Sequence, residues 1–186
     1  MVRQAHEQNT DIVLVDTGNS YEGLCEYFNG KYISYTEEHP ITMNPFQIKR
    51  EEWNIEKLGF LKNLVMLIWK GSQGTVTKTE DKLIEQVINE YYEAHFGKDS
   101  IGRLCFNSFY EFSTRRIPEI CDENELRGID LASYNYLLKE FYKGGSHELT
   151  LNENMDSSLF DETFIVFEID SIKDDPLLFP LVTLII

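Results

Sequence analysis

Two unbroken apolar runs, one near each end of the chain, predict buried strands. The first run, Ile12–Val15, predicts a strand over residues 11–16 that ends on Asp16, and the second, Phe164–Phe167, predicts a strand over residues 163–170 that ends on Asp170. Continuous β-branched and aromatic residues are typical of strands covered on both faces, as in a parallel sheet. A weaker strand is predicted over residues 31–36.

Between these strands, apolar residues recur every three or four positions, which is the spacing of one buried helix face. This pattern predicts a helix over residues 55–70 and a second helix that runs to about Phe96. Thr77 and Glu80 form a capping box that would open the second helix. Pro118 is expected to interrupt a third helix or to start a new one.

The order of these elements indicates an α/β fold with a helical insertion. We expect residues 1–53 and 146–186 to form a partial core of parallel strands, with an apolar helix over residues 176–186. Residues 54–145 would form the mostly α-helical insertion. A sheet of so few strands leaves its edges open, so we expect the interior of a larger sheet domain. A neighbouring copy of the chain is one way of closing those edges, which would give a homo-oligomer.

The chain is acidic, with 32 acidic against 17 basic residues and a net charge of −15. A surface of this sign repels phosphate backbones, so direct nucleic-acid binding is not expected. The three cysteines are scattered without a C-x-x-C pair, so neither a disulfide framework nor a metal site is expected. No segment approaches the ~20 apolar residues of a membrane span, and we expect a cytoplasmic chain.

The segment D-T-G-N-S, from Asp16 to Ser20, has three interpretations. It resembles the signature of aspartic peptidases, but these enzymes need two such Asp residues that share a proton, and only one copy is present. In a nucleotide-binding sheet, ligands lie beyond the carboxyl ends of the strands, which would put Asp16, Asn19 and Tyr21 next to a phosphate site. A tight turn closed by hydrogen bonds of Asp16 and Ser20 explains the same residues without chemistry.

The second strong strand carries two acids, Glu168 and Asp170. An apolar strand that ends in an acid resembles a Walker B strand, in which the acid holds Mg²⁺. A working site also needs the phosphate-binding sequence G-x-x-x-x-G-K-[ST], and this chain contains none. We therefore assign no catalytic residue, and we expect the chain alone to bind and hydrolyse no ATP.

Several segments are similar to the TraG family of conjugation ATPases from Bacteroides-type conjugative transposons. They follow one another in family order and span essentially the whole chain. These segments are Val2–Gln4, Ile12–Tyr21, Gly23–Cys25, Tyr35–Glu38, Pro40–Ile41, Asn44–Phe46, Asn107–Phe112, Tyr142–Gly145 and Phe164–Asp170.

The resemblance implies an interior fragment of a RecA-like P-loop NTPase core from a type IV secretion motor. It places the chain after the phosphate-binding loop, whose helix would end near residues 1–8, and before the family's Walker B strand. Asp170 would then lie on a neighbouring core strand. The parent would use ATP and Mg²⁺, form a hexamer with other motor subunits, contact secretion-system proteins, and lie at the inner face of the membrane. A non-catalytic interaction module is the remaining alternative.

Overall fold

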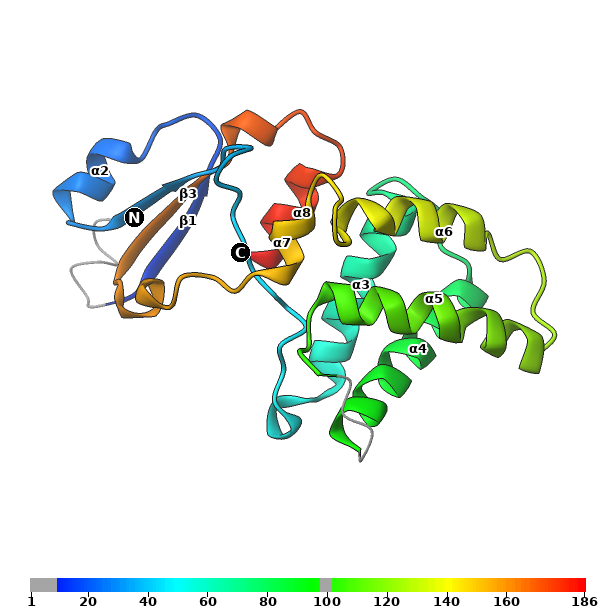
Figure 1. Ribbon diagram of the computed structural model, residues 1–186. Coiled ribbons are helices and arrows are strands. Elements are labelled where there is room, and N and C mark those ends of the chain that lie inside the picture. The colour runs from blue at the N-terminus through cyan, green and yellow to red at the C-terminus, as the bar shows by residue number, and fades with distance from the viewer. Residues whose placement is uncertain (1–9, 98–101) are drawn as a thin grey trace. The chain divides into compact units, whose positions relative to one another are not determined.

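The computed structural model describes residues 10–97 and 102–186 and separates the chain into two compact units (Figure 1). The first unit holds the sheet and is built from the chain up to Met43 together with Asn154–Ile186. The second unit, Asn44–Glu153, is helical. The helix end expected within residues 1–8 lies outside the described residues.

Three parallel strands form the sheet of the first unit, in the order β1-β3-β2 (Figure 1). The strands are β1 (Ile12–Asp16), β2 (Lys31–Ser34) and β3 (Phe164–Glu168). All five residues of the central strand β3 are buried, as its continuous apolar run predicted. The same prediction is wrong for β1, an outer strand on which Val13 and Val15 are exposed. The register pairs the last residue of each outer strand with the last residue of β3. Three chain segments that are far apart in sequence therefore end at one edge of the sheet.

The short helix α2 (Glu22–Tyr27) covers one face of this sheet. Its Cys25 packs with Phe164 and Val166 of β3 in a small apolar core. The turn after α2 brings Gly30 close to β3, and a Cβ there would lie 2.5 Å from the Phe164 carbonyl oxygen. Only glycine allows this approach, so the residue fixes where β2 begins.

The expectation that the last strand runs to Asp170 is wrong. β3 ends at Glu168, and Asp170 begins a short 3₁₀ helix, Asp170–Ile172. The reason is local, because the Glu168 side chain accepts a hydrogen bond from the Asp170 N–H (2.8 Å) and turns the chain. Helix α8 (Leu178–Ile185) follows, within the range expected for it.

The part of the second unit that the structure describes contains five α-helices. They are α3 (Ile55–Lys70), α4 (Lys78–Phe96), α5 (Phe106–Glu123), α6 (Leu131–Leu138) and α7 (Glu148–Asn152), with shorter 3₁₀ turns at Arg50–Glu52 and Lys139–Phe141. α3 packs against α4 and α6, and α4 packs against α5. The capping box of Thr77 and Glu80 opens α4 as predicted.

Pro118 does not interrupt a helix, contrary to the expectation. It lies inside α5, which continues to Glu123. A proline within a helix loses one backbone hydrogen bond. Ile117 and Ile120, on either side of it, are almost completely buried, and their packing compensates for the lost bond.

The helical unit extends beyond residues 54–145 at both ends. Phe46 is completely buried and stacks on Phe109, so the chain before the first helix belongs to this core. At the other end, the Asn152 side chain accepts a hydrogen bond from the Asn107 N–H and donates one to the Phe141 carbonyl. None of the helices in the described ranges is long and apolar enough to cross a bilayer.

Candidate functional site

The residues singled out from the sequence meet at the carboxyl edge of the sheet. Asp16, at the end of β1, is only 8% exposed and uses its carboxylate to hold the following turn. Its Oδ1 accepts the N–H of Thr17 (2.9 Å), and its Oδ2 accepts the N–H groups of Ser20 (2.6 Å) and Tyr21 (3.2 Å). The carboxylate therefore fixes the chain between β1 and α2.

Glu168, at the end of β3, holds the same turn from the neighbouring strand. It is 5% exposed, and its Oε2 accepts the N–H of Asn19 (2.8 Å). Asn19 has a positive φ of 50°, a conformation that asparagine tolerates better than most residues. The backbone N–H of Asn19 therefore points toward the sheet and reaches the Glu168 carboxylate.

Tyr32 of β2 joins the network from the third strand. Its hydroxyl lies 2.8 Å from Asn19 Oδ1 and 3.2 Å from Glu168 Oε2, and its single proton is shared between these two acceptors. Partial burial, together with the neighbouring charge of Glu168, raises the pKa of Tyr32 to about 12. The phenol therefore stays protonated at neutral pH and acts as a donor.

Both strand-end carboxylates are largely saturated as hydrogen-bond acceptors. An ionised carboxylate offers about four lone-pair positions, two on each oxygen. Three donors reach Asp16, and three reach Glu168, namely the N–H groups of Asn19 and Asp170 and the Tyr32 hydroxyl. In each case one oxygen accepts two donors. A metal ion could not be held by both oxygens of either residue without breaking the turn.

Asp170 does not join this network through its side chain. Its carboxylate is partly exposed and pairs with Lys173 at 2.8 Å. Within residues 10–97 and 102–186, no three His, Cys, Asp or Glu side chains gather closely enough to hold a metal ion. The sequence had indicated Asp16, Asn19 and Tyr21 at this edge, but it had indicated Asp170 rather than Glu168 as the acid that ends the second strand. It gave no signal for Tyr32, because only the parallel pairing of β2 with β3 brings that hydroxyl here.

A family model for the TraG P-loop domain matches residues 1–186. The chain belongs to the TraG P-loop family. This confirms the resemblance to the TraG conjugation ATPases. Among solved structures, the TraG-family chain is similar to VirB4 of Thermoanaerobacter pseudethanolicus, with 20% identity and a TM-score of 0.62. The match covers 94% of this chain and 46% of VirB4, so the chain spans less than half the length of that structure. No curated protein sequence matches the chain.

The likeness to VirB4 confirms the expected α/β fold of a P-loop NTPase. It also gives a context for the D-T-G-N-S segment. In this TraG-family chain the segment follows a strand of a parallel sheet, and the Asp16 carboxylate is occupied by the backbone of its own turn. An aspartic peptidase instead needs a second Asp that shares a proton with the first. The geometry favours the turn and offers nothing for the peptidase interpretation.

Proposed function

We propose that the chain is an interior part of the ATPase motor of a type IV secretion system that serves conjugation. The observation that carries this proposal is the match of the TraG P-loop family along all of residues 1–186. The sheet unit would contribute strands to a RecA-like core. The helical unit, Asn44–Glu153, would be an insertion that contacts neighbouring subunits or secretion partners. The complete motor would be a hexamer that uses ATP and Mg²⁺ at the cytoplasmic face of the membrane.

In this proposal the chain by itself is inactive. The sequence has no G-x-x-x-x-G-K-[ST] segment, whose backbone N–H groups and lysine neutralise a triphosphate. The acids at the strand ends support a turn, and they replace neither part of that cradle. The role of Asp16, Asn19 and Tyr21 would be to hold the sheet edge beside the nucleotide.

Titration of the purified chain with Mg-ATP, followed by a phosphate-release assay, tests the inactivity. We expect neither saturable binding nor turnover, and tight binding with turnover would contradict the proposal. The chain is then added to an active TraG-family motor. A change in the ATPase rate of that motor would support a role in the assembly, whereas binding without any change would favour the non-catalytic interaction module.

The peptidase alternative has its own assay. Incubation of the chain with an unfolded protein substrate at acidic and neutral pH is expected to give no cleavage. Cleavage that disappears in the Asp16→Asn variant would replace the motor proposal.

A further inference from the structure

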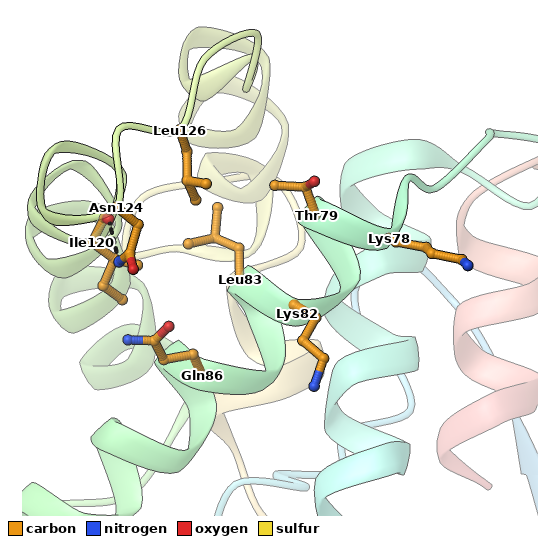
Figure 2. Close-up of a pocket in the computed structure, with 8 residues that line it drawn as sticks. All are labelled: Lys78, Thr79, Lys82, Leu83, Gln86, Ile120, Asn124 and Leu126. Carbon is orange, nitrogen blue, oxygen red and sulfur yellow. Dashed lines mark hydrogen bonds between the residues drawn. The ribbon is translucent and has the colours of Figure 1, made fainter.

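A hollow of about 310 Å³ lies on the helical unit between α4 and the end of α5 (Figure 2). Leu83 of α4 and Ile120 of α5 form its apolar floor, with half-buried Leu126 from the loop that follows α5. Figure 2 shows Leu83 and Leu126 pointing toward one another across it. A cavity of about 150 Å³ already holds a benzene molecule in another protein, so this hollow has room for an aromatic side chain.

Two lysines of α4, Lys78 and Lys82, lie at the rim. They are one helical turn apart, and in the described part of the chain neither ammonium group has an ion-pair or hydrogen-bond partner. Asp81 lines an adjoining hollow beside the same lysines, and it shares Lys62 with Glu85, at 3.0 and 3.2 Å. Both charged side chains that line the hollow are therefore basic, although the chain carries a net charge of −15.

The rim also offers acceptors for a buried hydroxyl group. Gln86 donates its amide N–H to Glu90, and Asn124 donates its own to the Ile120 carbonyl. Their amide oxygens remain available next to the apolar floor. A hollow with an apolar floor and free acceptors at its edge suits a tyrosine, whose ring is apolar and whose hydroxyl needs a partner when buried.

The sheet unit presents a surface of matching chemistry on α2. Glu22 and Glu26 are one helical turn apart and exposed, and within the described residues neither carboxylate has an ion-pair partner. The next residue, Tyr27, is 72% exposed, which is unusual for so large an aromatic side chain. Residues four positions apart on a helix lie about 5–6 Å from one another, so the two acids and the two lysines have the same spacing.

We propose that α2 of one copy of the chain binds the α4–α5 hollow of a second copy. Tyr27 enters the hollow, and Glu22 and Glu26 pair with Lys78 and Lys82. The two surfaces belong to different parts of the molecule, so the contact is heterologous: it repeats from copy to copy and forms a ring when the rotation closes. The inference concerns self-association alone, and it does not depend on nucleotide binding or hydrolysis.

Sedimentation velocity over a range of chain concentrations at about 0.15 M salt tests this contact, because long-range repulsion is screened beyond about 8 Å there. The chain is expected to associate as its concentration rises. Lys82→Glu and Glu26→Lys should each weaken association by about tenfold, since each turns an attraction into a repulsion. Lys57→Glu is the matched control, because Lys57 is exposed on α3 and does not line the hollow.

Mixing the two variants makes the test specific. In the mixture, each chain meets a partner of complementary charge at both surfaces, so association should return to the wild-type level. Tyr27→Ala should weaken association without changing the circular dichroism spectrum, since the ring is exposed in the single chain. A chain that stays monomeric at all concentrations, a control that weakens association equally, or a mixture that fails to recover would each overturn the proposal.

Discussion

Replacing Asp16 by Asn tests how the carboxyl edge of the sheet is held together. The substitution keeps the size of the side chain but removes the charge and turns one acceptor oxygen into a donor. In the native turn, Oδ2 accepts two backbone N–H groups, from Ser20 (2.6 Å) and Tyr21 (3.2 Å), and Oδ1 accepts that of Thr17 (2.9 Å). An amide can satisfy only one of these two sides.

The best arrangement for Asn turns its oxygen toward Ser20 and Tyr21 and its NH₂ group toward Thr17. One backbone N–H is then left facing another donor, which costs about 1–3 kcal/mol. The remaining two hydrogen bonds, from the Ser20 and Tyr21 N–H groups, then have a neutral acceptor, and hydrogen bonds to ionised groups are roughly twice as strong as neutral ones. Because Thr17 is exposed, water can replace part of the loss. We expect the sheet unit to lose about 2 kcal/mol of stability.

Hydrogen exchange of the β3 amides, followed by mass spectrometry, is the appropriate assay. Both tryptophans of the chain, Trp53 and Trp69, lie in the helical unit, so their fluorescence does not report on the sheet. A loss of about 2 kcal/mol corresponds to roughly 30-fold faster exchange through opening of the sheet unit.

The matched control is Asp11→Asn, which makes the same change at an exposed position just before β1. The control should exchange like the wild type. If Asp16→Asn also exchanges within about threefold of the wild type, corresponding to ~0.6 kcal/mol, the carboxylate does not hold the turn and our account of this edge is wrong.

Three further changes probe the packing of each unit. Tyr32→Phe should lower the stability of the sheet unit by about 1 kcal/mol in the same exchange assay. In an ultraviolet pH titration, the variant should lack the phenol whose pKa is raised to about 12. Gly30→Ala should destabilise the sheet by about 1–3 kcal/mol, because its Cβ would meet a β3 carbonyl at 2.5 Å, whereas Gly23→Ala on exposed α2 should stabilise it by about 0.5–1 kcal/mol. Burial alone would raise the pKa of Glu80, but hydrogen bonds from Lys70 and Thr77 outweigh this effect and lower the pKa below its ordinary 4.5. The ionised Glu80 therefore stabilises the helical unit fully above pH 4.5, and this contribution is lost on further acidification. Glu80→Gln should therefore lower the urea midpoint of the helical unit at pH 7, measured by tryptophan fluorescence, and reduce its acid sensitivity; an unchanged midpoint would contradict a role for the Lys70–Glu80 pair.

Local signals in the sequence were sufficient for most of the elements. The helix predicted over residues 55–70 is α3, and the capping box of Thr77 and Glu80 opens α4. Both follow from residues within one or two turns of each other. The strand starting near Phe164 was equally clear, because an unbroken apolar run needs cover on both faces.

Features that depend on distant contacts were not predictable in this way. Tyr32 and Glu168 are 136 positions apart, and their hydrogen bond requires that β2 pair with β3. The start of the helical unit was missed because Phe46 stands alone in sequence and finds its aromatic neighbours only in the folded core. Pro118 was misjudged because a local breaking rule was overruled by packing on both sides.

The network at the strand ends is better suited to support a nucleotide site than to form one. Asp16 accepts hydrogen bonds only from the turn that follows β1, and Glu168 accepts one from the same turn. This arrangement makes a prediction for the proposed complete motor. In that protein, Asp16→Asn should slow ATP hydrolysis by loosening the sheet edge, and the stabilising change Gly23→Ala should restore part of the rate. A metal ligand or a general base would behave differently, because added stability cannot replace a missing chemical group. Steady-state ATPase rates of the single and double variants distinguish the supporting role from a chemical one. Asp16 would be assigned to the chemistry if the double variant hydrolyses ATP as slowly as Asp16→Asn alone while the amide hydrogens of its sheet exchange as slowly as in the wild type.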